Sequence, residues 1–418
     1  MRVPMDAGIH GRAGAALILL AACTPPSETV ADRDQPITNG SPTDGDLAAV
    51  ALLGGDNVLV CSGALVAPRV VATAAHCVDG GGPLPQVYFG SEPGIDPGTR
   101  RAAIHVALLP GFDRATLTRD LAVLLLEAPA PAEAVPLSLF TSPFDATFVG
   151  RDVRLIGFGL TSSDGGEPNR KREGDTIIGD FGDTDFTFAP APSQTCVGDS
   201  GGPALLDVDG VERLLGIHSS GDAACAEFGR STRIDPFVDE FIVPYIEATA
   251  PGSAATGERC YYEENCADGT CIPALDEPSL SYCSRPCAGD AACPPAMICA
   301  IEEGLCRYEP PTPGALGAPC AEATECSSGV CAAADSGQPR ICTVRCFPDV
   351  PGACPEPYEC RTDGDDPERA VCVPGEDGGC GCRAGGGASG AGPALAILVA
   401  WLGRWRWRRR RRVVTARR

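Results

Sequence analysis

The cysteines of this 418-residue chain restrict its fold more than any other sequence feature. Sixteen of the 23 cysteines form two octets about 60 residues apart, and the octets share their first, second and fourth spacings. A match at a fixed offset is typical of a tandem repeat. Each octet is short and poor in aliphatic residues, so covalent cross-links are needed to limit its unfolded entropy. The octets are Cys260, Cys266, Cys271, Cys283, Cys287, Cys293, Cys299, Cys306 and Cys320, Cys326, Cys331, Cys342, Cys346, Cys354, Cys360, Cys372.

The pairing within each octet stays open, because eight cysteines allow many connectivities. Zinc binding is the alternative, since Cys283 and Cys287, like Cys342 and Cys346, are close in sequence. No histidine lies in either octet, and we favour disulfides. So many cysteines would be a liability in a reducing cytosol, so we expect the chain to be exported.

Residues 1–23 have the layout of a secretory signal: Arg2 and Arg12 precede a short apolar run that ends in Leu20-Ala21-Ala22-Cys23. These last four residues resemble the bacterial lipobox, in which the cysteine receives a lipid and becomes the new N-terminus. The alternative is an ordinary cleaved signal in which Cys23 is incidental. With either kind of signal, residues 24–36 would form a pro-segment.

The other end, residues 373–418, has three parts in a fixed order: Cys380-Gly381-Cys382, an apolar run over 393–403 and an arginine cluster over 408–412. This order resembles the C-terminal sorting tails of myxobacterial-type surface proteins. A permanent short membrane anchor is the alternative. With the lipobox, the tail predicts membrane association through lipid, tail or both, at the cell envelope or outer surface of a Gram-negative bacterium.

The charge of the body excludes one class of partner. Between residues 24 and 382 there are 21 basic and 54 acidic residues. Such an acidic body repels phosphate backbones, so we do not expect nucleic acid to be a partner.

Residues 37–250 form the one segment long enough to bury a full core. Its apolar runs are short and separated by turn residues, which predicts an all-β sandwich or barrel domain. The clearest runs are Ala48–Leu53, Val58–Val60, Ala64–Val66, Leu121–Leu126, Val153–Ile156 and Leu214–Ile217. A flexible linker, 251–259, leads to a first Cys-rich module over 260–306, and a stiff Pro-rich linker, 307–319, leads to a second over 320–372.

Three short segments of 37–250 carry residues suited to chemistry. His76 follows small residues, Asp120 precedes an apolar run, and Ser200 lies among glycines. Singly, each has a simpler explanation: a structural histidine, an acid that ends a strand, a bare turn. Together they supply a nucleophile, a base and an acid that orients the base, which are the groups that acyl transfer needs.

The chain order His76, Asp120, Ser200 is that of chymotrypsin. With the run Gly198-Asp199-Ser200-Gly201-Gly202-Pro203, it makes residues 37 to about 248 resemble the trypsin-like (chymotrypsin-fold) serine proteases. The resemblance implies two antiparallel β-barrels followed by the two small disulfide-rich modules. It also implies a serine endopeptidase that acts on polypeptide substrates and needs no cofactor or metal.

The resemblance assigns roles to the matching residues. Ser200 would attack the scissile carbonyl, His76 would act as general base and then acid, and Asp120 would orient the imidazole. The amides of Gly198 and Ser200 would form the oxyanion hole. Ser219 would support this triad and pair with the substrate backbone. The resemblance also implies two disulfides, Cys61 with Cys77 and Cys196 with Cys225.

Activation departs from the family pattern. In such zymogens a new N-terminal Ile or Val pairs with the acid before the nucleophile, here Ile37 with Asp199. Ile37 follows Pro36, whereas tryptic activation cuts after Arg or Lys. We therefore expect an unknown activating protease. A cut before Ile37 would release the catalytic domain from a lipid on Cys23 and leave the C-terminal tail to hold it.

Specificity departs as well. The pocket-floor position, six residues before the nucleophile, is Gln194 instead of the Asp that selects basic residues. Gly221 and Gly229 match the two glycines that leave the pocket open. We therefore expect cleavage after a neutral, medium to large residue.

Two other functions remain open. The alternative hypothesis is that the chain is a catalytically silent surface binding protein built on a protease scaffold. The Cys-rich modules are in either case candidates for adhesion to surface material.

Overall fold

The computed structural model describes residues 35–80, 82–161, 169–188, 193–333, 339–346, 352–363 and 366–375. It divides into two compact units, Met1–Arg345 and Cys346–Arg418, which are described separately. The predicted signal with Cys23 and nearly all of the predicted tail lie outside the described residues. In the part of the chain that is described, no helix has the length and apolar character to cross a membrane.

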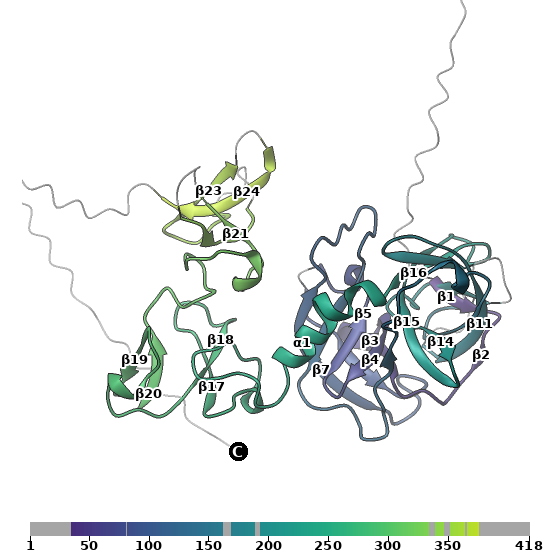
Figure 1. Ribbon diagram of the computed structural model, residues 1–418, viewed down its shortest axis with the longest axis horizontal. Helices are drawn as coiled ribbons and strands as arrows, with labels where there is room; N and C mark the ends of the chain where they lie inside the picture. Colours follow the sequence, from purple (N-terminus) through teal and green to yellow (C-terminus); the bar gives the residue numbers. More distant parts are fainter. Residues whose placement is uncertain are drawn as a thin grey trace, which may run out of the picture. The chain divides into compact units, whose positions relative to one another are not determined.

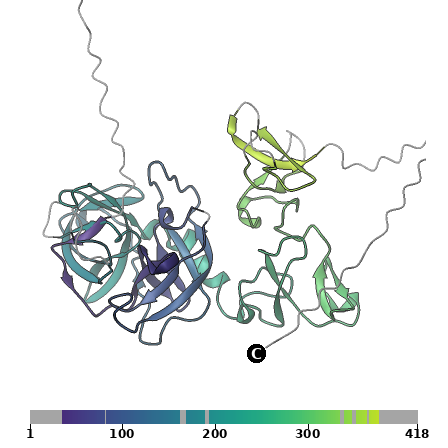
Figure 2. The ribbon, with the colours of Figure 1, turned by 180° about the vertical axis from the view of Figure 1, so that it is seen from behind.

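The first half of the chain contains a closed barrel of six antiparallel strands, ordered β3-β4-β5-β8-β7-β6. Labels β3, β4, β5 and β7 mark it in Figure 1, and Figure 2 shows the same ribbon from behind. The strands are β3 (Ala49–Leu53), β4 (Leu59–Ala67), β5 (Val70–Thr73), β6 (Gln86–Phe89), β7 (Thr99–Leu108) and β8 (Ala122–Leu126).

Six further strands form a second closed ring, ordered β10-β14-β15-β16-β12-β11, which the pairing of β10 with β11 completes. They are β10 (Asp152–Gly157), β11 (Arg172–Phe181), β12 (Asp185–Phe188), β14 (Pro203–Val208), β15 (Val211–Gly221) and β16 (Gly229–Arg233). Three short pairings accompany this ring. Strand β1 (Gln35–Thr38) pairs with β13 (Gln194–Cys196). Strand β2 (Ser41–Pro42) pairs with β11, and β9 (Ser138–Leu139) pairs with β15. Two antiparallel barrels are what the sequence resemblance predicts, and the fold class is confirmed.

Strand β8 explains why an uninterrupted apolar run belongs to a barrel. Alternate residues of a strand face opposite sides. Leu124 and Leu126 point into a cluster within the first barrel, whereas Val123 and Leu125 join a cluster shared with the second barrel. Both faces of β8 are therefore buried. The shared cluster also includes residues of the second barrel region and of the helical segment that follows it: Ile156, Leu205, Leu214, Ile217, Ile234, Ile242 and Tyr245.

Among the described residues, helical structure is limited to short segments. The α-helix α1 (Val243–Ala248) follows turns over Asp235–Phe237 and Val238–Ile242. The remaining helical turns are Gly55–Asn57, Ala75–Cys77, Ala146–Phe148, Glu263–Asn265, Asp290–Ala292 and Ala323–Glu325.

Cross-links organise the Cys-rich region. Within each octet the first cysteine pairs with the third, the second with the fourth, the fifth with the seventh and the sixth with the eighth. Cys283 and Cys287, whose spacing left zinc open, belong to different disulfides. No disulfide joins the two halves of an octet, and the boundary between the two compact units falls between the halves of the second octet, after Arg345.

Small two-stranded ladders accompany these disulfides. In the first compact unit they are β17 (Thr270–Pro273) with β18 (Ser281–Ser284), β19 (Met297–Ala300) with β20 (Leu305–Tyr308), and β21 (Cys331–Ala332) with β22 (Ile341–Cys342). In the second unit, β23 (Tyr358–Asp363) pairs with β24 (Asp366–Pro374).

The segment 251–259 is hydrogen-bonded to the first Cys-rich module, since the Gly252 amide donates to the Glu264 carbonyl at 2.8 Å and the Ala254 amide donates to the Asn265 carbonyl at 3.0 Å. Asn265, which is fully buried, donates from Nδ2 to the carbonyl oxygens of Ala248 at 3.2 Å and Ala250 at 3.0 Å. These carbonyls lie at the end of α1, where helical partners are missing. Arg69 of the first barrel stacks on the Tyr262 ring, 3.7 Å from its centroid. The first Cys-rich module is therefore attached to the barrels by side-chain contacts that a composition argument does not see.

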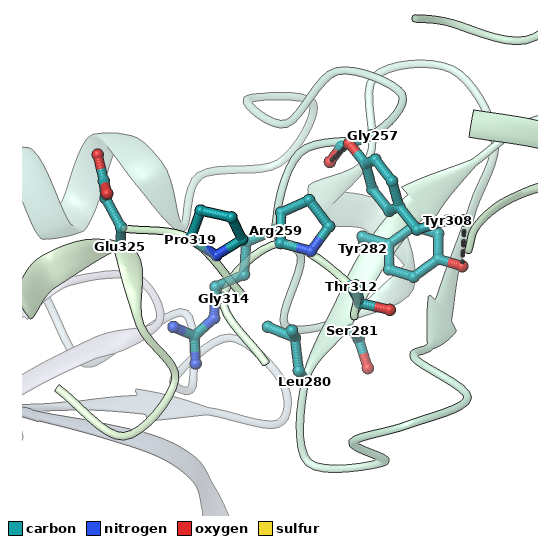
Figure 3. A pocket seen from close by; sticks show the side chains of 11 residues that line it. Gly257, Arg259, Leu280, Ser281, Tyr282, Tyr308, Thr312, Gly314, Pro319 and Glu325 are labelled. Carbon is teal, nitrogen blue, oxygen red and sulfur yellow. Dashed lines mark hydrogen bonds between the residues drawn. The ribbon is translucent and has the colours of Figure 1, made fainter. Parts of the chain in front are cut away.

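The Pro-rich segment 307–319 is also tied down. Thr312 donates to both carboxylate oxygens of Asp276, at 2.8 and 2.6 Å, and the amide of Leu316 donates to Glu277 at 3.0 Å. A cavity of about 430 Å³ lies beside it (Figure 3), lined by residues that include Arg259 and Tyr282. The predicted stiff spacer is thus folded against the first module.

Candidate active site

Asp120 and His76 meet at the end of the first barrel. His76 lies in the helical turn after β5, and Asp120 lies two residues before β8, which pairs with β5. The His76 Nδ1 atom is 2.7 Å from Asp120 Oδ2, and the His76 amide donates to Asp120 Oδ1 at 2.9 Å. Ser219 of the second barrel donates its hydroxyl to Asp120 Oδ2 at 2.6 Å. Both carboxylate oxygens of this fully buried acid are therefore satisfied.

Ser200 is held between the barrels by its backbone. It follows β13 and precedes β14, and it is nearly buried, with 5% exposure. Its carbonyl oxygen accepts a hydrogen bond from the Ser62 amide of the first barrel at 2.8 Å. The disulfide sulfur of Cys77, the residue after His76, lies 3.8 Å from the same oxygen. Ser200 is thus positioned beside the His76 turn.

The turn around Ser200 depends on glycines at positive φ. Gly198 has φ +100° and Gly201 has φ +85°. A Cβ on Gly201 would lie 2.1 Å from Thr73 Oγ1 and 2.2 Å from the Ser62 carbonyl oxygen, closer than real Cβ contacts. The carbonyl of Gly198 accepts a hydrogen bond from the Ser62 hydroxyl at 2.8 Å, which fixes the peptide orientation at this residue.

Asp199, the residue before Ser200, is fully buried. Its Oδ1 accepts from the Gly159 amide at 2.9 Å, and its Oδ2 accepts from the Cys196 amide at 3.1 Å. Burial raises the pKa of Asp199 to about 7 in spite of these bonds. A Cβ on Gly157 would lie 1.9 Å from Asp199 Oδ1, so only glycine fits at position 157.

The structure contains the uncut chain at Ile37. The nitrogen of Ile37 is part of the Pro36–Ile37 peptide bond, so the expected ion pair with Asp199 has not formed. Ile37 is nonetheless buried, with 1% exposure, and its strand β1 pairs with β13, which ends three residues before Asp199. The two residues are therefore in neighbouring segments.

The predicted specificity residues come together around β15 and β16. Gly221 and Gly229 are cross-strand partners. A Cβ on Gly229 would lie 3.0 Å from Gln194 Oε1 and 2.5 Å from Phe188 Cδ2. Gln194 is 1% exposed, and Phe188, which sequence reasoning missed, packs at the same point. Cys196–Cys225 and Cys61–Cys77 are both disulfide-bonded.

Asp222 is a second residue that sequence reasoning missed. Its carboxylate accepts backbone hydrogen bonds from Ala224, Ala226, Glu227 and Phe228, at 2.8 to 3.3 Å. Partial burial would raise the pKa of Asp222, but these bonds outweigh it and hold the pKa below its usual value. The carboxylate thereby organises the loop that joins Gly221 to Gly229. An aspartate at the start of a short loop is the only sequence signal for this role.

His218 has a structural place. Its ring is buried, its Nδ1 lies 3.1 Å from Ser231 Oγ, and burial lowers its pKa to about 3. Its backbone bonds to Gly201 and Gly202 support the Ser200 turn. A buried, neutral imidazole in this place fits a residue of the pocket wall. It does not fit a group that carries protons at neutral pH.

The Gly201 contacts predict a large effect of one methyl group. Gly201→Ala adds the cost of positive φ to an overlap with Thr73 and Ser62, so we expect at least about 3 kcal/mol loss of unfolding free energy. Gly210→Ala is the matched control, because Gly210 has φ +81° and no atom within 4 Å of the added Cβ. It should cost about 1 kcal/mol. Urea unfolding of both variants measures the difference, and equal losses would contradict the packing argument.

Comparison with known proteins agrees with this geometry. A trypsin family profile matches residues 37–239. The chain is 30% identical over 188 residues to a trypsin of Simulium vittatum, covering 40% of this chain and 72% of that protein. It is 28% identical over 196 residues to a trypsin of Saccharopolyspora erythraea (43% of this chain, 83% of that protein) and 29% identical over 201 residues to brachyurin of Leptuca pugilator (44% and 87%). The chain therefore belongs to the trypsin family of serine proteases.

Proposed function

We propose that this protein is an exported serine endopeptidase, held at the cell surface, which hydrolyses peptide bonds through an acyl-enzyme on Ser200. The observation that carries the proposal is the contact of Asp120 with both His76 and Ser219, next to the Ser200 turn. These groups come from both barrels and are oriented by buried hydrogen bonds. Polypeptides are the substrates that this family membership supports.

The protonation of His76 follows from its contact with Asp120. A carboxylate only accepts, so Nδ1 carries the proton that faces Asp120, and Nε2 of the neutral ring keeps its lone pair. Nε2 then takes the proton of Ser200 as its oxygen attacks the scissile carbonyl, and gives it to the leaving amine. The amides of Gly198 and Ser200 would stabilise the oxyanion, a contribution of about 10²–10³ in rate for one such donor.

Activation would require a cut between Pro36 and Ile37 by an unknown protease. The new ammonium of Ile37 would pair with Asp199, whose buried carboxylate accepts hydrogen bonds from two backbone amides and whose pKa is also lowered by the charge of Arg172. This proposal explains why an acid is buried where burial raises its pKa to about 7.

Export and surface attachment are the remaining parts of the proposal. Ten disulfides among the described residues are compatible with an oxidising compartment. The lipobox-like Cys23 and the sorting-type tail would provide attachment at the envelope of a Gram-negative bacterium. The Cys-rich modules would act as spacers or adhesion elements.

A catalytically silent surface binding protein is the second candidate. The Pro36–Ile37 junction favours it, because this bond does not match the basic-residue cleavage that activates tryptic zymogens. The intact His76, Asp120 and Ser200 favour the enzyme.

Fluorophosphonate labelling distinguishes these two functions. We expect envelope-derived protein that begins at Ile37 to be labelled, and Ser200→Ala to abolish the label, because only the activated hydroxyl reacts. Mass and N-terminal sequence of the labelled chain are read together. A chain that starts at Ile37 and takes no label would support the binding protein instead.

The neutral floor of the specificity pocket predicts the cleavage profile. Gln194 offers no charge to a basic side chain, so we expect cuts after neutral, medium to large residues in a peptide library. Gln194→Asp should shift the preference toward Arg and Lys, because a buried carboxylate attracts a cation. A wild-type profile dominated by Arg and Lys would be incompatible with this assignment.

The raised pKa of Asp199 predicts a pH dependence of the uncut chain. The pKa is about 7 when folded against an ordinary value of 3.8, so the unfolded chain releases the proton first. Stability should therefore fall as pH rises from about 4 to about 7, by up to about 4 kcal/mol. Asp199→Asn in a Ser200→Ala background should remove this part of the slope in urea unfolding. If the unfolding free energy of the Asp199→Asn variant kept the same pH dependence, this assignment to Asp199 would be wrong.

A further inference from the structure

The cavity beside the Pro-rich segment 307–319 has the size of a small-ligand site (Figure 3). Its volume of about 430 Å³ falls within the range of about 300–1,000 Å³ that such sites occupy. Its lining comes from three stretches of the first compact unit, 257–259, 280–282 and 308–319, and from Glu325 of the second Cys-rich module. None of these residues belongs to the candidate active site.

One part of the lining is apolar and closely packed. Leu280 and Tyr282 are only 3% and 2% exposed, and the rings of Tyr282 and Tyr308 meet edge to face with their centroids 5.0 Å apart. Pro313 and Pro319 add ring carbons where the lining is exposed. An apolar group that enters the cavity would therefore exchange water for aliphatic and aromatic carbon.

Hydrogen bonds hold the walls of the cavity in place. The Tyr308 hydroxyl donates to the Gly257 carbonyl at 2.9 Å, and the Tyr308 amide donates to the Tyr282 hydroxyl at 3.3 Å. The Pro-rich wall is joined to the second module, because the Ser327 amide donates to the Gly314 carbonyl at 2.9 Å. A site whose walls are fixed in this way loses little conformational entropy when a ligand binds.

The charges that line the cavity are unequally satisfied. The Arg259 guanidinium carbon lies 5.2 Å from the centroid of the Tyr261 ring, and within the described residues the Arg259 side chain forms no ion pair and no hydrogen bond. Glu325, the one acidic lining residue, accepts from the amides of Ala321 and Glu322 at 2.6 and 3.4 Å. The N–H donors of Arg259 are therefore available to a ligand.

The groups around Arg259 do not neutralise its charge. Burial and the charge of Arg259 lower the pKa of His105 to about 4, and its Nδ1 lies 2.8 Å from the Tyr245 hydroxyl oxygen. Burial raises the pKa of Tyr245, so this hydroxyl keeps its proton at neutral pH. Glu258, the residue before Arg259, accepts instead from the Ala255 amide at 2.8 Å. A cation without an acidic partner thus lines a cavity with apolar walls.

We propose that this cavity binds an apolar carboxylate, for which the C-terminus of a peptide ending in an aliphatic residue and a free alkyl carboxylic acid are the two sources. Arg259 would donate parallel N–H bonds to the carboxylate, a strong and directional pairing. Leu280 and Tyr282 would cover the apolar group. The acidic body of the chain repels anions at a distance, so binding depends on this direct contact.

Calorimetric titration of the full chain tests the cavity without catalysis, because Ser200→Ala prevents hydrolysis of the probes. The probes are acetyl-alanyl-leucine, its C-terminal amide, and octanoate. We expect the peptide acid or octanoate to bind at least about tenfold more tightly than the amide, which offers Arg259 no negative charge. Tighter binding of the peptide acid assigns a peptide C-terminus as the ligand, and tighter binding of octanoate assigns a free alkyl acid.

Substitution of Arg259 locates the binding. Arg259→Gln should weaken binding of the carboxylates at least about tenfold and remove their advantage over the amide, whereas Arg259→Lys should keep part of it because the charge remains. Arg345→Gln is the matched control, an exposed arginine of the same compact unit outside this cavity, and should leave every affinity unchanged. Urea unfolding of each variant verifies that it is folded.

Three results would overturn the proposal. They are equal affinities for acid and amide, no binding of any probe, and a preference for the carboxylate that survives Arg259→Gln. The last result would mean that the carboxylate binds elsewhere, such as beside position 200. None of them bears on the proposed peptidase function, which the fluorophosphonate label on Ser200 tests separately.

Discussion

A carboxylate with no exposure to water lies at the seam of the two barrels, and the rest of the site depends on how it is satisfied. Burying an ionised acid costs several kcal/mol unless donors replace its hydration. Asp120 receives them from the His76 amide and ring on one side and from the Ser219 hydroxyl on the other. Because Ser219 belongs to the second barrel, Asp120 receives its full set of donors only when the barrels are docked. The shared hydrophobic cluster, to which β8 contributes Val123 and Leu125, supplies that docking.

The neighbouring acid, Asp199, has a contrasting environment. It is as deeply buried as Asp120, but its carboxylate accepts hydrogen bonds from two backbone amides, and burial raises its pKa to about 7. The glycines around it are required by space: Gly157 leaves room for the carboxylate, and Gly201 for the contact with Thr73. A cation brought close to this buried acid would stabilise its ionised form.

The Cys-rich region replaces a hydrophobic core with cross-links. Each four-cysteine half has interleaved disulfides and a two-stranded ladder, a size at which apolar burial alone is insufficient. Polar side chains rather than flexible spacers connect the first module to its neighbours. Asn265 binds the carbonyls that end α1, and Asp276 and Glu277 bind the Pro-rich segment. Each adds a hydrogen bond to a backbone group of the adjoining segment.

The sequence by itself identified the family of this protein, because His76, Asp120 and Ser200 stand in short motifs whose order and glycine content are typical of one family. It also determined that the second half is a disulfide repeat and that the barrel domain is all-β. Only the tertiary structure decided the cysteine pairing, the support of the pocket loop by Asp222, the requirement for Gly157, and the cavity beside the Pro-rich segment. These features depend on contacts between residues far apart in the chain, such as Gly157 with Asp199 or Asn265 with Ala248. Local pattern carries no information about which distant atoms will share the same space.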